Sequence, residues 1–356
     1  MKIGVLTTSY PRWEGDYAGC FVADRVRALL EAGHAVDVLA AGEQGQPPGS
    51  TPSNAGADPL SDNLHVVRLP ANVPGGPSLF YGAGAPEALE SADRRAYLAA
   101  LRYLAALSSA AATRARTSRW DAIEAHWLVP SALAALAGAA HLPVRAYAHS
   151  GDVALLERFP FGDALARYLA ASGADLRFVT AELRDRFARL AGRAVGTVEP
   201  LEAPLALFRA RGTGPDPALR AALGLGAPTL LAVGRLVPIK GHAALLRSCA
   251  LLRRSRAAAG RPEVVILGDG PERQRLRDLA AALEVPLRLP GFVPRDEVAR
   301  WLRAADLFVQ PSIRLPSGRS EGAPVAVAEA RAVGTPVVIG GDLATLDRAL
   351  QSVTAA

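Results

Sequence analysis

Lysine and cysteine are scarce in this sequence. Among its 40 lysines and arginines, lysine stands only at Lys2 and Lys240, so almost every positive side chain is an arginine. The two cysteines, Cys20 and Cys249, lie in different halves of the chain on helical patterns. This spacing excludes a disulfide framework and a cysteine-based metal cluster, and it indicates reduced thiols.

Long apolar runs are also missing. No stretch approaches the roughly 20 continuous apolar residues that a membrane span needs, and the opening run 1–6 is too short for a signal peptide and lacks a cleavage site. The net charge of +6 allows attraction to phosphates or to an anionic membrane face. The arginines are spread through helical patterns without interleaved aromatic residues, so nucleic-acid binding is not expected. We expect a cytoplasmic protein, and peripheral contact with the inner face of a membrane stays open.

Strand and helix patterns alternate along the whole chain. A length of 356 residues, with 50% hydrophobic and 21% charged residues, fits a globular protein of two domains. The alternation predicts an α/β fold with parallel sheets covered on both faces. The expected strands are 3–8, 35–40, 65–69, 122–126, 144–149, 176–180, 230–233, 264–267, 287–289, 307–310 and 336–339. The expected helices include 21–32, 94–115 and those that begin at Ala243, Glu272, Asp296 and Val325.

Irregular segments indicate the domain boundaries. The pattern is lost between residues 203 and 228, where several glycines and prolines occur, and this predicts a linker. We expect an amino-terminal domain 1–204, a linker 205–228 and a carboxyl-terminal domain 229–356. Segments 42–63 and 71–86, rich in glycine and proline, should be surface loops.

The most informative motif is Gly-Arg-x4-Lys-Gly, which begins at Gly234 directly after an apolar strand pattern. It places Arg235 and Lys240 at the carboxyl edge of a parallel sheet, where open α/β sheets bind ligands. A solvated surface lysine is the default interpretation. In a chain that otherwise uses arginine, however, the retained ammonium favours a diphosphate site.

A second motif, Glu-x7-Glu, follows further along the chain. Glu321 precedes Gly322 and Ala323 at the start of a helical pattern, and Glu329 lies about two turns along it. Backbone N–H groups at a helix start receive anions, and carboxylates accept hydrogen bonds from hydroxyls. Charged helices produce such a pair by chance, but in combination with the first motif it indicates a nucleotide-sugar site.

Three loops carry two interpretations each. Gly268 opens a Gly-Asp-Gly-Pro segment that fits a simple turn and a ligand contact equally well. Phe292 and Val293 follow a strand, and Phe292 fits a core position and a ligand-facing position equally well. Gly15 and Gly19 let backbone amides approach a phosphate or an acceptor, although a plain turn remains an alternative.

Two histidines end neighbouring strand patterns. His149 is followed by Ser, Gly and Asp, and this polar, turn-forming context favours a functional role. His126 ends the preceding strand and is more simply read as structural.

Together these motifs resemble the retaining, nucleotide-sugar-dependent glycosyltransferases of family 4, which have the GT-B fold. The resemblance extends over nearly the whole chain and implies two Rossmann-like parallel-sheet domains facing across a cleft. It also implies transfer of a sugar from a nucleotide diphosphate sugar to a glycan, lipid-linked or small-molecule acceptor, with retention. The nucleotide sugar is then a co-substrate. No cofactor and no metal are expected, because two cations already meet the diphosphate.

The resemblance gives the motif residues their roles. Arg235 and Lys240 hold the diphosphate, Glu321 touches the transferred sugar, Glu329 touches the ribose, and His149 lies beside the sugar. The expected catalytic residues are therefore His149, Arg235, Lys240 and Glu321. The segment at Phe292 and Val293 brackets the nucleobase. The expected donor-binding residues are Gly15, Gly19, Gly234, Arg235, Lys240, Gly268, Phe292, Val293, Glu321, Gly322, Ala323 and Glu329.

The sequence departs from the family pattern in two places. Residues 200–204 read Pro-Leu-Glu-Ala-Pro where the family has Pro-Asn-Gly-Val-Asp or a close variant. After Gly341 the family continues with further loop, strand and helices, whereas this chain passes to Asp342 and reads as an internal deletion. We therefore expect an unpaired sheet edge, uncovered apolar surface at 337–339, a second domain of low stability and weak or absent transfer.

Two other functions are considered. The deletion motivates a shortened, non-catalytic relative that binds a nucleotide or a glycan. A nicotinamide-dependent enzyme is disfavoured, because the first strand leads into Thr-Thr-Ser-Tyr-Pro without a Gly-x-Gly-x-x-Gly turn.

Overall fold

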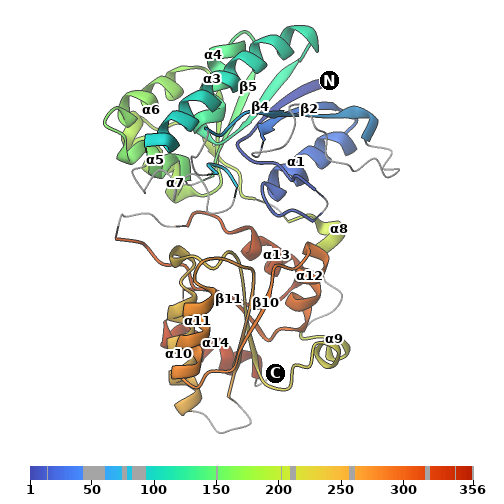
Figure 1. The fold of residues 1–356 in the computed structure, drawn as a ribbon, viewed down its shortest axis with the longest axis vertical. Coiled ribbons are helices and arrows are strands. Elements are labelled where there is room, and N and C mark those ends of the chain that lie inside the picture. Colours follow the sequence, from blue (N-terminus) through green and yellow to red (C-terminus); the bar gives the residue numbers. More distant parts are fainter. Residues whose placement is uncertain are drawn as a thin grey trace. The chain divides into compact units, whose positions relative to one another are not determined.

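The chain forms two compact units, Met1–Pro200 and Leu201–Ala356, in a computed structural model (Figure 1). The structure describes residues 1–13, 15–42, 61–73, 78–81, 94–149, 151–201, 203–208, 214–255, 261–316, 321–340 and 342–354. Most of the two expected surface loops lies outside these residues.

The first unit is built on a seven-stranded sheet in the order β3-β2-β1-β4-β5-β6-β7. All neighbouring strands are parallel. The six expected strands are confirmed as β1 (Lys2–Leu6), β2 (Ala35–Ala41), β3 (Leu64–Leu69), β4 (Ala122–His126), β5 (Val144–Ala148) and β6 (Asp175–Phe178), and β7 (Thr197–Val198) is additional.

Helices connect these strands, as the alternating pattern predicts. They are α1 (Cys20–Glu31), η1 (Ser61–Asn63), α3 (Arg94–Thr117), η2 (Leu128–Ala132), α4 (Leu133–Ala139), α5 (Gly151–Arg158), α6 (Gly162–Ala171) and α7 (Ala181–Ala191). Apolar residues of α1 pack on Val5, Val36 and Val38 at one face of the sheet. Gly4 lies between such positions, and a Cβ there would come within 2.4 Å of the Trp120 ring, so the glycine makes room for the indole.

The second unit holds a five-stranded parallel sheet in the order β10-β9-β8-β11-β12. Its strands are β8 (Thr229–Val233), β9 (Glu263–Leu267), β10 (Leu287–Gly291), β11 (Leu307–Gln310) and β12 (Val337–Ile339). Its helices are α8 (Leu205–Phe208), α9 (Pro217–Ala222), η3 (Pro238–Lys240), α10 (His242–Ser255), α11 (Arg273–Ala282), α12 (Arg295–Ala304), α13 (Val325–Val333) and α14 (Leu343–Thr354).

Helices cover both faces of the second sheet (Figure 1). Successive strand residues point to opposite faces, so Leu230 packs with α10, α11 and α14, while Leu231 packs with α8, α12 and α13. The stretch 205–228, which we expect to be a linker, belongs to this second unit where it is described. Phe208 and Leu225 lie in the apolar cluster with Leu231.

The expected uncovered surface at 337–339 is wrong for two of its three residues. Val338 is 6% exposed and packs in one cluster with Leu346 of α14. Val337 packs against the cluster on the other face of the sheet. Ile339 is 61% exposed. The reason is that α14, whose amphipathic pattern follows the apparent deletion, lies against α10, β11 and β12 and covers this part of the sheet.

Candidate functional site

The carboxyl ends of β8, β9 and β11 meet at one edge of the second sheet. β8 pairs with both β9 and β11 in parallel register, so the residues that follow these strands are brought together. Gly234 follows β8, Gly268 follows β9, and the loop toward Glu321 follows β11. The strand-end loops that carry Gly234, Gly268 and Glu321 therefore lie at one edge of the sheet.

Lys240 and Glu321 form an ion pair at this edge. The ammonium of Lys240, the last residue of η3, donates to Glu321 Oε1. Their side chains are only 14% and 19% exposed. Glu321 Oε2 accepts from Gln310 Nε2 at 3.0 Å and from the Ser312 hydroxyl. One carboxylate is thus held by three donors from two separate loops, which fixes its position.

Gln310 and Ser312 are site residues that the sequence analysis does not include. Gln310 ends β11 after three apolar residues and is buried, and its Oε1 accepts no hydrogen bond from the described part of the chain. A polar residue at the end of an apolar strand is the signal that could have identified it.

The glycines allow the two strand-end loops to approach each other. Gly234 has φ +152°, and Gly268 has φ +137°. A Cβ at Gly268 would lie 2.1 Å from the Gly234 carbonyl oxygen, and one at Gly234 would lie 3.0 Å from Lys240 Cε. Leu236 N–H donates to the Asp269 carbonyl at 2.9 Å, which ties the loops together. Close packing accounts for Gly268, and a direct donor contact by this residue stays a prediction.

A buried histidine supports the Gly-Arg loop. His242, the first residue of α10, donates from Nε2 to the Arg235 carbonyl at 3.3 Å. Burial, and then the nearby Lys240 charge, lower the pKa of His242 to about 4. The neutral ring with hydrogen on Nε2 is therefore the form that makes this contact. Arg235 itself is partly exposed.

Glu329 lies on α13, which begins at Val325 as expected. It is buried and receives two hydrogen bonds from Arg295 of α12, from Nε at 3.0 Å and from Nη2 at 2.6 Å. The Arg295 guanidinium lies 5.4 Å from the centre of the Phe208 ring. Arg295 is a further residue that the sequence did not single out, since nothing in the local pattern pairs it with Glu329.

The loop before α13 and the loop after β10 carry the remaining predicted residues of this unit. Gly322 and Ala323 are partly exposed and lead through Pro324 into α13. Val293 packs against the apolar cluster of the second unit. Phe292 is 47% exposed, so the alternative that it is a core residue is wrong. Its role beside a nucleobase stays a prediction.

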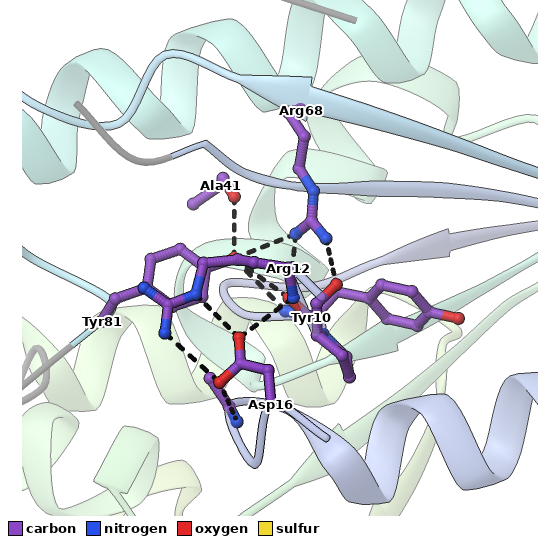
Figure 2. Close-up of polar contacts among 8 residues, drawn as sticks. Tyr10, Arg12, Asp16, Ala41, Arg68 and Tyr81 are labelled. Carbon is purple, nitrogen blue, oxygen red and sulfur yellow. Dashed lines mark hydrogen bonds and ion pairs between the residues drawn. The ribbon is translucent and has the colours of Figure 1, made fainter. Parts of the chain in front are cut away.

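In the first unit, the loop after β1 is held by a polar cluster (Figure 2). Arg68 of β3, buried, donates to the carbonyls of Tyr10 and Pro11 and, at 3.0 Å, to the hydroxyl of Tyr81. The Tyr81 hydroxyl donates to the Ala41 carbonyl at 2.8 Å. The cluster connects the loop to the ends of β2 and β3.

The same loop contains an internal ion pair. Arg12 Nε donates to Asp16 Oδ2 at 2.7 Å (Figure 2). The Arg12 guanidinium also lies 4.1 Å from the Trp13 ring centre and 4.4 Å from that of Tyr81. Gly19 has φ +71°, and a Cβ there would lie 2.2 Å from the Ser9 carbonyl oxygen, so this position requires glycine. Gly15 has φ +84° and open space around it. The loop is more than a plain turn, and its contact with a phosphate or an acceptor stays a prediction.

His149 follows β5 and contacts the other histidine singled out in the sequence. His149 Nε2 lies 3.1 Å from His126 Nδ1. Burial lowers the pKa of His126 to about 3 and the pKa of His149 well below its ordinary value. The structure thus joins a residue expected to be functional to one read as structural.

Membrane-spanning helices and metal-binding clusters are both absent from the part of the chain that the structure describes. No helix there has both the length and the apolar character to cross a membrane. His, Cys, Asp and Glu side chains form no group of three or more placed to hold a metal ion in that part of the chain.

Comparisons with known proteins give a family model and several curated relatives. Residues 218–342 match the family model described as glycosyl transferases group 1. The amylovoran biosynthesis glycosyltransferase AmsK of Erwinia amylovora is 39% identical over 111 residues, which are 31% of this chain and 26% of AmsK. The GDP-mannose-dependent alpha-(1-6)-phosphatidylinositol monomannoside mannosyltransferase of Mycobacterium tuberculosis is 33% identical over 215 residues, 58% of this chain and 53% of that protein. The chain therefore spans about a quarter to a half of the length of these relatives.

Solved structures resemble both units. Sucrose-phosphate synthase of Thermosynechococcus elongatus aligns with a TM-score of 0.69 and 18% identity, over 99% of this chain and 90% of that one. HepE of Anabaena in complex with UDP-glucose aligns with a TM-score of 0.64 and 16% identity, over 99% and 90%. Residues 218–342 are therefore similar to the group 1 glycosyl transferases, and the chain has the GT-B fold of two parallel-sheet α/β domains.

Proposed function

We propose that this protein transfers a sugar from a nucleotide diphosphate sugar to a glycan, lipid-linked or small-molecule acceptor, with retention of configuration. The observation that carries the proposal is the Lys240–Glu321 pair at the carboxyl edge of the second sheet. It sets a cation and a fixed carboxylate side by side within the segment that matches the glycosyltransferase family. The relatives support the donor class, since one is named GDP-mannose-dependent and one was solved with UDP-glucose.

The cations of the loop after β8 suit a diphosphate. An ammonium has three N–H donors, and Glu321 takes one from Lys240, which leaves two for phosphate oxygens. Arg235 adds a guanidinium at the same strand end. In transfer, these charges would stabilise the negative charge that develops on the leaving nucleoside diphosphate.

The carboxylates suit hydroxyl groups. Glu321 uses about three of its roughly four acceptor positions on Lys240, Gln310 and Ser312, so about one remains for a sugar hydroxyl. Glu329, held by Arg295, is assigned to the ribose. Gly322, Ala323 and the segment at Phe292 are assigned to the donor by resemblance, and His149 to the sugar. No carboxylate is assigned as a nucleophile, so catalysis rests on positioning and charge.

A donor screen tests the proposal. Purified protein is mixed with UDP-, GDP- and ADP-sugars, and thermal shift, donor hydrolysis and transfer to acceptor mixtures are measured. We expect one donor to raise the melting temperature and to be turned over. NMR of the product should show the anomeric configuration of the donor, which tests retention.

Binding without turnover is the outcome that favours the second candidate, a non-catalytic relative. Glu202, which stands where the family has a turn glycine, and the departure after residue 341 favour that candidate. If no nucleotide sugar or nucleoside diphosphate shifts the melting temperature, sugar transfer and nucleotide binding are excluded, and only glycan binding is left for the second candidate.

A further inference from the structure

His126 and His149 lie in an aromatic enclosure at the ends of β4 and β5. Their ring centres are 5.3 Å apart at an interplanar angle of 20°, and His126 Nδ1 lies 3.1 Å from His149 Nε2. The Tyr147 ring stacks on His126 at 4.9 Å, and the Phe21 ring lies 4.7 Å from His149. Trp127 completes the enclosure at 5.1 Å from His149.

Both rings are neutral in this environment. Burial is the main cause of their lowered pKa values, and the positive charge of Arg25 adds to the effect at His126. The titratable groups that surround the pair are Arg25 of α1 with its partner Glu124, Tyr147 of β5, and Asp152 of α5. Burial raises the pKa of Asp152 to about 6 and that of Tyr147 to about 12, and the Asp152 carboxylate accepts from the backbone N–H groups of Leu128 and His149.

The contact restricts where two neutral rings carry their hydrogens. Each neutral imidazole has one N–H and one bare nitrogen. If His126 Nδ1 donates, His149 Nε2 is bare and His149 carries its hydrogen on Nδ1. If His149 Nε2 donates, His126 Nδ1 is bare and carries none, so its hydrogen is on Nε2. The two rings therefore have the same tautomer, either both Nδ1–H or both Nε2–H.

The other two ring nitrogens complete the pattern. His149 Nδ1 and His126 Nε2 are buried and make no hydrogen bond to the described residues. In the first arrangement His149 Nδ1 is a donor, and in the second it is an acceptor. The tautomer of His126 therefore determines whether His149 Nδ1 is a hydrogen-bond donor or an acceptor.

The backbone around the pair is held in place. Asp152 accepts hydrogen bonds from the N–H groups of Leu128 at 2.8 Å and His149 at 3.2 Å, and so joins the loops that follow β4 and β5. Trp127, in the loop after β4, has φ +72°, which is costly for a residue with a side chain. These backbone constraints hold the two histidine rings in their relative positions.

We propose that His126 is a positioning residue that sets the tautomer of His149, so that the two rings change tautomer only together. This inference rests on the proposed function, in which His149 meets the transferred sugar. A sugar hydroxyl that donates to His149 Nδ1 then requires the Nε2–H tautomer on both rings. One that accepts from it requires Nδ1–H on both.

Ring NMR of the full chain tests the pairing without any activity. Protein labelled with ¹⁵N in its histidines is measured by long-range ¹H–¹⁵N correlation, with His149→Gln and His242→Gln used for assignment. We expect His126 and His149 to show the same tautomer and to stay neutral from pH 8 to pH 5. Opposite tautomers, or a ring that titrates with the pKa of a free histidine, would overturn the proposal.

Substitution of His126 tests the dependence of one ring on the other. In His126→Phe, which keeps an aromatic ring but no hydrogen bond, we expect His149 to shift to the mixed tautomers of a free imidazole. His65→Gln, at an exposed position, should leave His149 unchanged. An unchanged His149 tautomer in His126→Phe contradicts the proposal. If that variant does not fold, His126→Asn replaces it in the same measurement. The wild-type spectrum tests the matched tautomers without any variant.

Kinetics with the best nucleotide-sugar donor distinguish the histidine pairing from the proposed function. His126→Phe should lower kcat of transfer by roughly tenfold or more, through misplacement of a group in the site, with KM for the donor within about twofold of the wild type. Matched tautomers in a protein without transfer would reject the proposed function and keep the histidine pairing. Transfer with mismatched tautomers would do the reverse.

Discussion

The two units place chemically opposite clusters after their strands. In the second unit the candidate site is charged, with Lys240 against Glu321 and Arg295 against Glu329. In the first unit the pair His126 and His149 is neutral and enclosed by aromatic rings. Cations can attract a diphosphate by Coulomb forces. A neutral pair of rings can only distinguish hydrogen-bond donors from hydrogen-bond acceptors. Under the proposed function, the second unit would supply affinity for the diphosphate and the first unit would orient the sugar, and the following changes test this division.

The largest effect should come from α14. Leu346 is fully buried on the face of the second sheet, so Leu346→Ala should lower the free energy of unfolding of the second unit by about 2–5 kcal/mol. Leu101→Ala, on an exposed position of α3, should change stability by less than about 0.5 kcal/mol. Hydrogen exchange read separately in the two units is the measurement. An unchanged second unit would mean that α14 does not cover the sheet, and the low stability expected from the sequence would regain its basis.

Removal of a cation from the loop after β8 should weaken donor binding. Lys240→Ala and Arg235→Ala should each weaken donor binding by about 1.5–3 kcal/mol, the range for hydrogen bonds to charged groups. Lys2→Ala removes the only other lysine and serves as the matched control. Titration calorimetry with the best donor gives the values. Equal affinities for Lys240→Ala and Lys2→Ala would remove the diphosphate role.

Acid should destabilise both units through their buried histidines. A histidine with a lowered folded pKa stabilises the folded protein above pH 6.5, and that contribution is lost as pH falls toward the folded value. His126, with a pKa of about 3, and His242, with a pKa of about 4, should each cost about 2 kcal/mol at pH 5 relative to pH 7. His149 acts in the same direction.

Asp152 works against this trend in the first unit only. Its folded pKa of about 6 is raised, so its contribution grows as pH falls, by about 1 kcal/mol between pH 7 and pH 5. Urea unfolding at both pH values is the measurement. His126→Phe should reduce the pH dependence of the first unit and leave that of the second unchanged. Stability that is flat from pH 7 to pH 5 in both units would show that the buried histidines take up protons in the folded protein as they do in the unfolded protein.

The smallest effect separates the two glutamates. Glu321→Gln should spare the free nucleoside diphosphate and weaken the intact donor by about 1 kcal/mol, because it removes one acceptor for a sugar hydroxyl. Glu329→Gln should weaken both ligands, and it should also lower stability because it leaves Arg295 without its carboxylate. Binding of both ligands to both variants is compared at a temperature where each is folded. Identical profiles would exclude the separate assignment to sugar and ribose.

The sequence predicts the strands of both sheets better than it predicts the side-chain contacts at the strand ends. Apolar runs between helical patterns identify all of the first six strands and the charged motif after β8, because period and order along the chain carry that information. The partners Gln310, Arg295 and His242 lie outside the motifs. Arg295 reaches Glu329 only through the packing of α12 beside α13, and Gln310 reaches Glu321 only through the course of the loop after β11. His242 contacts Arg235 within one loop, a contact that the motif does not state. The His126–His149 contact likewise depends on β4 and β5 being neighbours, which no local pattern states. The covering role of α14 is not expected from the family motifs, which end at residue 341; the information lies in the amphipathic pattern beyond them.

Arg68 has a consequence for how this protein can diversify. It holds the loop after β1 through the carbonyl oxygens of Tyr10 and Pro11, and every amino acid provides that oxygen. The Arg68 anchor is therefore indifferent to which side chains stand at the two positions whose carbonyls it holds. Trp13 differs, because its ring packs on Arg12, the partner of Asp16. The loop can thus vary where Arg68 alone supports it, while a change at Trp13 also alters the Arg12–Asp16 pair.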